Sequence, residues 1–240
     1  MLLRATTIFA AAILMVLAPS IGRADLASYS QDFEGLDPGN PDALANDGWL
    51  VFGNVFDPGG GYLYGYGPFP APNGSGAFCA IATGEGGPDQ GAQQLSVYSD
   101  YLNTDHGLGN LIESNVFQEQ MIGSPDVGKT YEFVFDAKLG NLELSSTALA
   151  FIKTLDPNSG YATTNFLTVD MTSIPTTWNT YSLSIAIDSG LIGQILQFGF
   201  SNTATLYQGS GVFYDNVNFD VMGSVAVEPG SWARTKALYR

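Results

Sequence analysis

The chain contains little positive charge. It has 8 basic and 23 acidic residues among 240, which gives a formal net charge of −15 at pH 7. Between Asp25 and Met222 the basic residues are Lys129, Lys138 and Lys153, and this stretch contains no arginine. A nucleic-acid site needs a basic patch, so we expect no nucleic-acid partner. Anionic membrane surfaces and acidic glycans are disfavoured for the same reason, unless a cation bridges them.

Cysteine and histidine are almost absent. Cys79 is the single cysteine, so no disulfide can form within the chain. Its apolar neighbours, residues 77–81, predict a buried strand and a buried thiol rather than a nucleophile. His106 is the single histidine, which excludes a zinc site built from a histidine cluster.

Long amphipathic helices are also lacking, and short strand patterns take their place. Residues 131–138 and 181–187 alternate apolar and polar side chains, as half-buried antiparallel strands do. We predict an all-β fold, a jelly-roll β-sandwich of two antiparallel sheets. Two loops, residues 57–76 and 83–91, are rich in glycine and proline, and a helical turn is expected at 189–192. The other predicted strands lie near residues 29–34, 48–56, 77–82, 92–98, 113–121, 147–153, 164–169, 195–200 and 211–219.

The first 24 residues predict a cleaved signal peptide. Arg4 precedes an apolar run over residues 6–18, and small residues at 22 and 24 suit a cleavage site after Ala24. A membrane anchor is the alternative, but the run is shorter than the ~18–20 residues that a spanning helix needs. We therefore expect a secreted protein, extracellular or at the cell surface, with one sandwich domain over residues 25–222.

The end of the chain, residues 223–240, is expected to be a disordered tail without a membrane anchor. Residues 227–232 resemble the Pro-Glu-Pro sorting signal of exported Gram-negative bacterial proteins. Val227 stands in place of the first proline, and the basic residues Arg234, Lys236 and Arg240 replace the apolar helix that should follow. The segment is either a truncated signal or a chance match.

Residues 123–130 match the phosphate-loop pattern G-x-x-x-x-G-K-T. That loop requires a strand before it and a helix after it, so that the helix N-terminus faces the phosphates. Here the following residues alternate with the period of a strand, and Pro125 interrupts the loop. We therefore expect no nucleotide partner.

Several short motifs resemble carbohydrate-binding modules with a galactose-binding-like jelly roll. They are a Gly-x-Thr-Tyr turn that leads into an aromatic strand at 128–138, an opening segment at 31–35 followed by Trp49, and an aromatic-Asp-x-Val closing strand at 212–217. Together they span most of residues 29–219. The resemblance implies a jelly-roll fold and a carbohydrate ligand, such as an extracellular polysaccharide.

The closing strand contains a carboxylate that needs a partner. Alternation places Phe213, Asp215, Val217 and Phe219 on one face, so we predict that Asp215 points toward the core. A buried carboxylate is costly unless it is paired or coordinated, and the chain offers little lysine and no nearby arginine. A cation is then an attractive partner. The alternatives are that Asp215 accepts backbone hydrogen bonds near a strand end or is protonated.

Asp32 and Glu34 share one face of the opening strand. Modules of the family that the chain resembles commonly hold a structural calcium between their first and last strands, through a glutamate and an aspartate at these places. Carboxylates and backbone carbonyls are the oxygen ligands that Ca2+ prefers. The resemblance therefore implies Ca2+ bound by Glu34 and Asp215, with Asp32 as a further candidate ligand.

Two loops gather residues suited to sugars. Pyranose rings stack on flat aromatic side chains, while amides and carboxylates bond their hydroxyls. The alternative is that these aromatic side chains pin the loops to the sandwich. The candidate ligand-binding residues are Tyr62, Tyr64 and Tyr66 in one loop, and Tyr98, Asp100, Tyr101, Asn103 and His106 in the other.

The leading hypothesis is a secreted, non-catalytic, calcium-stabilised sandwich that binds carbohydrate at the cell surface or in the extracellular matrix. A structural or adhesive matrix protein without a specific glycan is the first alternative. The second is a polysaccharide-degrading lyase or glycosidase, in which His106 with nearby Tyr101, Asp105 and Glu113 would serve in acid/base chemistry.

Overall fold

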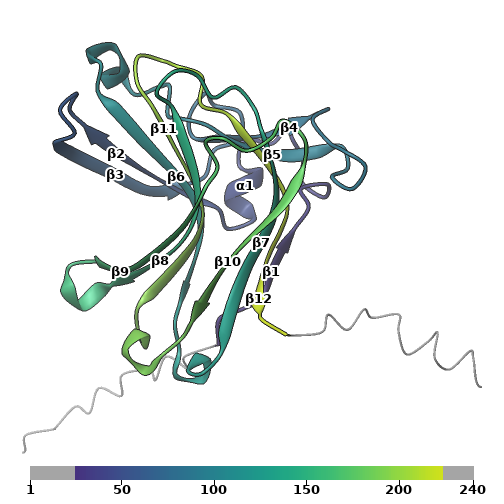
Figure 1. The fold of residues 1–240 in the computed structure, drawn as a ribbon, viewed down its shortest axis with the longest axis vertical. Coiled ribbons are helices and arrows are strands. Elements are labelled where there is room, and N and C mark those ends of the chain that lie inside the picture. Colours follow the sequence, from purple (N-terminus) through teal and green to yellow (C-terminus); the bar gives the residue numbers. More distant parts are fainter. Residues whose placement is uncertain (1–24, 224–240) are drawn as a thin grey trace, which may run out of the picture.

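The computed structural model describes residues 25–223 as two antiparallel β-sheets packed face to face (Figure 1). This is the predicted jelly-roll β-sandwich. The predicted signal peptide, residues 1–24, lies outside the described residues, as does the predicted tail from residue 224 onward. Nucleotide binding at the phosphate-loop pattern was rejected because a strand, not a helix, was predicted after it. A strand does begin at Thr130.

The first sheet has the strand order β10-β7-β12-β5-β4, and β1 also pairs with β12. Strands β5 and β1 pair with successive halves of the same edge of β12, the first with residues 212–214 and the second with residues 217–219. The strands are β1 (Tyr29–Gln31), β4 (Cys79–Thr83), β5 (Gln93–Val97), β7 (Thr130–Leu139), β10 (Asn179–Ala186) and β12 (Val212–Val221).

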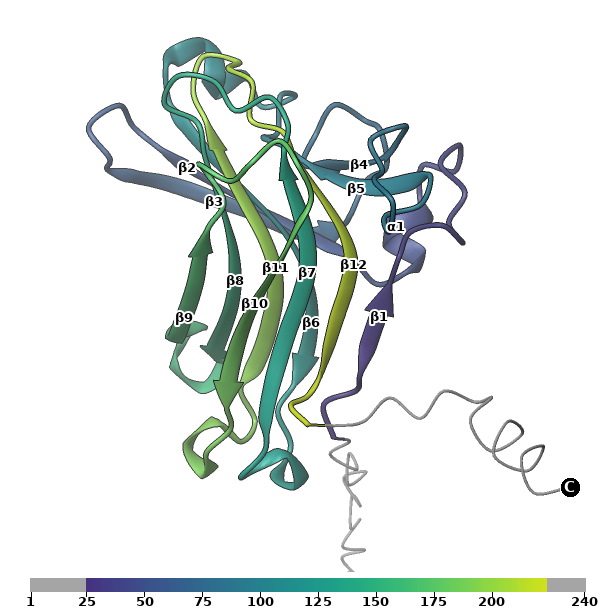
Figure 2. The same cartoon turned by 45° about the vertical axis from the view of Figure 1, so that its right-hand side comes forward.

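The second sheet has the order β3-β2-β6-β11-β8-β9. Figures 1 and 2 show the β2–β3 and β8–β9 hairpins splaying apart on either side of β6 and β11. The strands are β2 (Leu50–Phe56), β3 (Tyr62–Pro70), β6 (Leu111–Met121), β8 (Thr147–Asp156), β9 (Ala162–Asp170) and β11 (Ile195–Ala204).

Helical structure is limited to short turns. The turn predicted at 189–192 is present as η4, and no helix among residues 25–223 is long and apolar enough to cross a membrane. The elements are α1 (Ala43–Asn46), η1 (Thr104–Leu108), η2 (Ser124–Asp126), η3 (Pro157–Ser159) and η4 (Ser189–Leu191).

Aromatic rings from both sheets fill the core. Phe198 of β11 stacks on Phe219 of β12 with centroids 4.3 Å apart, and Phe200 stacks on Tyr214 at 3.6 Å. All four side chains are fully buried, and so is Trp49. Each such ring contributes roughly 2–3 kcal/mol by burial, so the alternating aromatic strands specify the interface between the sheets.

The prediction of a loop over residues 57–76 was wrong in part, because residues 62–70 form β3. Glycine and proline are excluded from central strands but tolerated at a sheet edge, and β3 is an edge strand. Its pairing with β2 also uses glycine, since a Cβ on Gly53 would overlap the ring of Tyr66 and one on Gly65 would meet Phe52.

The predicted face of Asp215 was also wrong. A β-bulge lies between Asp215 and Asn218, and Asn216 has a φ of 46°. The extra residue shifts the alternation, so Tyr214 rather than Phe213 joins the core with Val217. Asp215 instead lies on the outer side of the sheet, where other segments cover it.

Candidate functional site

Asp215 is fully buried although it lies on the outer side of the first sheet. Its Oδ1 accepts a hydrogen bond of 2.6 Å from the Asn216 N–H, and its Oδ2 has no partner among the described residues. Burial raises the pKa of Asp215 to about 7, and the Asn216 hydrogen bond opposes this rise. Neighbouring carboxylates add to the rise: Asp136, Asp32 and Glu34.

The bulge places Asp215 where β1 ends and β5 begins. Glu34 follows β1, and its Oε1 accepts hydrogen bonds from the backbone N–H groups of Ala92 (2.7 Å) and Gln93 (2.6 Å), at the start of β5. The Glu34 N–H in turn donates to Asp32 Oδ1 at 3.1 Å. Both of these carboxylate side chains are exposed, and both lie near enough to Asp215 to raise its pKa.

A second buried carboxylate, Asp136, is paired in register with Asp215 across β7 and β12. It accepts hydrogen bonds from Gln90 Nε2 (2.8 Å), Thr180 Oγ1 (2.6 Å) and Asn216 Nδ2 (2.8 Å). Burial alone would raise the pKa of Asp136, but these three donors outweigh it and hold the pKa below its usual value. Asp136 is therefore satisfied by protein donors, and Asp215 is not.

The chemistry at Asp215 suits a hard cation in part. A buried carboxylate oxygen without a donor is the group that a cation would satisfy. However, no three His, Cys, Asp or Glu side chains within residues 25–223 are placed to hold a metal together. Asp215 with Glu34 would therefore need backbone carbonyl oxygens to complete a site.

The structure brings together predicted ligand-binding residues from the β2–β3 hairpin and from part of the second loop. The Tyr64 hydroxyl donates to Asp105 at 2.6 Å, and the Tyr66 hydroxyl donates to Asp100 at 2.8 Å. Asn103 Nδ2 donates to both phenol oxygens, at 3.4 and 3.3 Å. These bonds tie the hairpin to the loop. The ring of Tyr62 lies outside this network, 60% exposed and against Phe56.

The remaining predicted loop residues form a separate ring stack. Tyr98 and Tyr101 lie parallel with centroids 6.0 Å apart, and His106 packs between Tyr101 and Tyr207. His106 is fully buried, its Nε2 lies 3.2 Å from Ser99 Oγ, and burial lowers its pKa. The His106 ring thus contacts the loops that surround it. This position supports the alternative interpretation, that rings in these loops hold them against the sandwich.

The outer face of the second sheet carries polar residues that the sequence interpretation did not assign. We call this face the β6–β11 trough. Its central side chains point away from the core yet are almost completely buried, so the flanking strands enclose them. Its residues are Phe52, Asn54, Glu113, Asn115, Phe117, Glu119, Phe151, Lys153, Gln197, Gly199 and Ser201.

Carboxylate–amide pairs line the trough. Glu113 Oε1 accepts hydrogen bonds from Asn54 Nδ2 (2.7 Å) and Asn115 Nδ2 (3.0 Å). Further along β6, Glu119 Oε2 accepts from Gln197 Nε2 at 2.7 Å. Gln197 Oε1 has no partner among the described residues. The trough therefore contains fixed acceptors of the kind that bind ligand hydroxyl groups.

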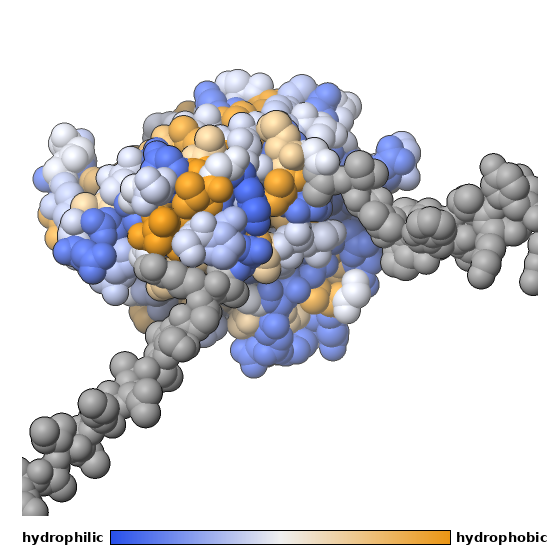
Figure 3. All heavy atoms as spheres, turned by 90° about the horizontal axis from the view of Figure 1, so that it is seen from below, coloured by the Kyte–Doolittle hydropathy of each residue, from blue (hydrophilic) through white to orange (hydrophobic). Residues whose placement is uncertain are grey.

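Apolar side chains lie between these pairs. The buried rings of Phe117 and Phe151 flank Gly199, where a Cβ would overlap Val116 and Phe117 on the neighbouring strand. The Lys153 ammonium lies 5.1 Å from the Phe151 ring centroid, and burial lowers its pKa against the attraction of Glu113 and Glu119. At the lower end of the trough, Met121, Ile195 and Leu155 lie in register. Figure 3 shows the molecule from below, where hydrophobic side chains lie between hydrophilic ones.

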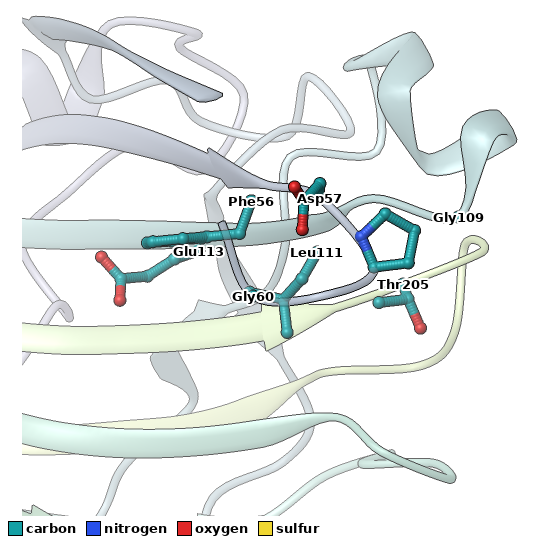
Figure 4. A pocket seen from close by; sticks show the side chains of 8 residues that line it. Phe56, Asp57, Gly60, Gly109, Leu111, Glu113 and Thr205 are labelled. Carbon is teal, nitrogen blue, oxygen red and sulfur yellow. The ribbon is translucent and has the colours of Figure 1, made fainter. Parts of the chain in front are cut away.

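A pocket of about 490 Å³ adjoins the upper end of the trough (Figure 4). Glu113 belongs to both, and the turn of the β2–β3 hairpin supplies Asp57. The lining residues are Phe56, Asp57, Pro58, Gly60, Gly109, Leu111, Glu113 and Thr205. The trough is thus open to a ligand at this end.

Alternation along β6 is the signal that could have identified the trough. Glu113, Asn115, Phe117 and Glu119 occur at every second position, so they share one face of the strand. The sequence does not tell which face of the sheet is outward, nor that the neighbouring strands would enclose it.

No model of a known protein family matches the chain, and no curated protein matches it. Among solved structures, the chain is similar to the C-terminal family 22 carbohydrate-binding module of Clostridium thermocellum Xyn10B, with 18% identity, coverage of 82% of this chain and 95% of that one, and a TM-score of 0.41. It is also similar to a cyclase from Fischerella sp., with 14% identity, 80% and 95% coverage, and a TM-score of 0.44.

A third similar structure is the enzymatically active domain of bacteriophage CBA120 tailspike protein 4, with 14% identity and a TM-score of 0.45. The match covers 78% of this chain but only 21% of the tailspike chain, and the chain likewise spans 30% of a two-module xylanase structure from Clostridium thermocellum. These proteins include a binding module and catalytic domains, so similarity of fold does not indicate which function this chain has.

Proposed function

We propose that this chain is a secreted protein that binds a neutral polysaccharide along the β6–β11 trough. The observation that carries the proposal is the set of carboxylate–amide pairs, Glu113 with Asn54 and Asn115, and Glu119 with Gln197, beside the half-buried ring of Phe52. Fixed acceptors suit sugar hydroxyls, and apolar rings suit the C–H faces of a pyranose. The similarity to a family 22 carbohydrate-binding module is compatible with this function.

The charge of the chain supports a neutral ligand. Lys153 is the one basic side chain in the trough. It lies level with Glu119, across Gln197, and both Glu113 and Glu119 attract its ammonium group. The formal net charge of −15 adds long-range repulsion against polyanions. A neutral chain avoids both costs.

The proposed function is binding without catalysis. The two trough glutamates are six residues apart on β6, about 20 Å along a strand, whereas glycosidases hold their carboxyl pair within about 5–10 Å. His106, the residue of the lyase alternative, is fully buried between tyrosine rings. Neither group is arranged for acid/base chemistry on a polymer.

We also propose that Ca2+ binds at Asp215 and Glu34, with backbone carbonyls, and stabilises the junction of β1, β5 and β12. The unpartnered Oδ2 of Asp215 supports this role. Metal that binds only the folded chain raises its stability by mass action. A chelator should therefore lower the melting temperature, and no shift with chelator would contradict the proposal.

The ligand proposal is tested by affinity electrophoresis and calorimetry with soluble neutral polysaccharides, including xylan and mixed-linkage β-glucan. Glu113→Gln and Glu119→Gln each weaken a charge-assisted network, and we expect about 10- to 100-fold weaker binding, since such hydrogen bonds contribute about 1.5–3 kcal/mol. Glu132→Gln makes the same change on the outer face of the first sheet and should bind normally. If no glycan binds, the structural or adhesive alternative is favoured.

A further inference from the structure

A second groove lies on the opposite side of the sandwich from the trough. Two adjoining pockets of about 410 and 300 Å³ share Tyr101 and Asn141. We call them together the tyrosine groove. It is lined by Ser96, Tyr98, Tyr101, Asn141, Glu143, Tyr207, Gly209, Gly211 and Phe213. Ser96 and Phe213 pair in register on the outer face of the first sheet, so the groove and the trough face in opposite directions.

The walls of the tyrosine groove are held by a short backbone ladder. The N–H groups of Asn141 and Glu143 donate to the carbonyls of Gly211 (3.1 Å) and Gly209 (2.9 Å). In return, Gly211 N–H donates to Asn141 Oδ1 at 2.8 Å and Gly209 N–H to Glu143 Oε2 at 3.2 Å. A Cβ at either glycine would overlap atoms of Asn141, so the close approach of the two loops requires glycine there.

The floor of the tyrosine groove consists of rings fixed by their hydroxyl groups. The Tyr101 hydroxyl donates to the Gln208 carbonyl at 2.7 Å and lies 2.6 Å from Ser210 Oγ. The Tyr98 hydroxyl donates to the Cys79 carbonyl at 3.0 Å. The two rings are parallel to within 10°. Because the hydroxyls anchor the rings to the loops, the rings are preorganised for a flat ligand and lose little entropy on binding.

The polar groups around the rings favour an uncharged ligand that carries hydroxyls. Asn141 and Glu143 are exposed at one end and offer amide and carboxylate groups. At the other end the Lys138 ammonium lies 5.3 Å from the Phe213 ring centroid and is paired with Glu85 at 2.8 Å. Glu143 repels an anion and Lys138 repels a cation, so neither kind of ion is favoured along the whole groove.

We propose that the tyrosine groove is a second carbohydrate-binding site, so that one molecule holds two polysaccharide chains on opposite faces. The inference rests on the proposed function in taking the same ligand class, a neutral polysaccharide. Two sites that face apart cannot both bind one rigid stretch of a chain. The two sites therefore join neighbouring polysaccharide chains. Once one site is bound within a polymer network, the other site is held at a high effective concentration of neighbouring chains. The protein then acts as a cross-linker of an extracellular matrix.

The experiment has two arms, both with the full mature chain. Calorimetry with xylohexaose and cellohexaose counts sites, and light scattering with soluble xylan and mixed-linkage β-glucan reports cross-linking. The wild-type protein should bind two hexasaccharides and give scattering that rises and then falls with the protein-to-polymer ratio. Tyr101→Ala should reduce the count to one and remove the scattering maximum, while binding in the trough persists.

Tyr207→Gly provides a second variant in case Tyr101→Ala fails to fold. Tyr207 is 52% exposed and has a φ of 58°, a conformation that glycine adopts freely, so the change removes an exposed ring with little strain. We expect weaker binding at one site and a lower scattering maximum. Glu119→Gln is the matched trough variant, and it should weaken binding at the other site about 10- to 100-fold.

The outcomes separate the two proposals. A count of one that falls with Glu119→Gln but not with the folded groove variants overturns the second site and leaves the trough in place. A count of one that falls only with the groove variants overturns the trough. Absence of binding to every probe overturns both.

Discussion

The outer faces of the two sheets both bury polar side chains, but they do so in different ways. On the first sheet a β-bulge and the meeting of β1 with β5 enclose Asp215, and the neighbouring loop donates to Asp136 through Gln90. On the second sheet, the flanking strands bury Asn115 and Gln197, while their partner Glu113 is half-buried and Glu119 is exposed, and the pocket at one end stays open. The first arrangement is the one proposed to bind a small ion, and the second is the one proposed to bind a polymer.

The largest expected effect concerns the loop that covers the first sheet. Asp136→Ala removes the acceptor of three donors, from Gln90, Thr180 and Asn216. Because buried donors without a partner are costly, the free energy of unfolding should fall by about 3 kcal/mol. Urea denaturation measures it. Asp188→Ala is the control, because exposed Asp188 accepts one bond, from the Gly190 N–H, and should cost much less.

The next effect is the pH dependence of stability without metal. The folded pKa of Asp215 is about 7, above its usual value of 3.8, so the folded state holds the proton more tightly. Stability should therefore fall as pH rises from about 4 to about 7, by up to about 1.4 kcal/mol per pH unit from this group. Denaturation in chelator at a series of pH values measures the slope.

Asp215→Asn sharpens the same comparison. The variant should show a flatter pH dependence in chelator and be more stable than the wild type at pH 8. Calcium should stabilise the wild type at pH 8 and leave the variant unchanged. Equal responses to calcium in both proteins would place the ion elsewhere.

A smaller effect is expected in the trough. Gln197→Leu removes an Oε1 that has no partner and an Nε2 that donates to exposed Glu119, which water can solvate instead, so the free energy of unfolding should change by only about 1 kcal/mol. Binding of neutral polysaccharide should nevertheless weaken about tenfold, since the donor that fixes the Glu119 carboxylate is lost. Parallel melting and calorimetry separate the two quantities. Loss of stability without loss of affinity would make Gln197 structural.

The smallest effects concern the lysines. Lys138→Met breaks the 2.8 Å pair with Glu85, but the long apolar chain still covers Phe213 and Trp178. We expect a loss of about 1 kcal/mol or less. Lys129→Met breaks a 3.6 Å surface pair with Asp25 and should be almost neutral. Thermal melting of both variants in low and high salt checks the order.

The sequence predicted much of the fold because alternation is a local property. The strands that contain Phe133 and Ile185, and the turn at 189–191, follow from side-chain period and turn residues alone. Strand β3 was missed because an edge position, which tolerates its glycines and prolines, is a property of the whole sheet. The bulge at Asp215 is likewise invisible to a count of every second residue.

The candidate sites were less predictable, since they depend on pairing between distant segments. Burial of Asp215 was expected, but for a reason that the bulge overturns. Tyr66 and Tyr101, in two different loops, were both predicted to bind the ligand, whereas Tyr66 bonds to Asp100 and Tyr101 lines the tyrosine groove. The trough needed the register of β2, β6, β11 and β8, which no local pattern contains.

The central claim is that the outer face of the second sheet binds glycan. It is tested most directly by backbone amide NMR of the mature chain during titration with xylohexaose and other neutral hexasaccharides. The account predicts that amides of β6 and β11, from Glu113 to Glu119 and from Gln197 to Ser201, shift with the largest amplitudes apart from those of the tyrosine groove. Shifts confined to the β2–β3 hairpin, or none in β6 and β11 with any hexasaccharide, would contradict it.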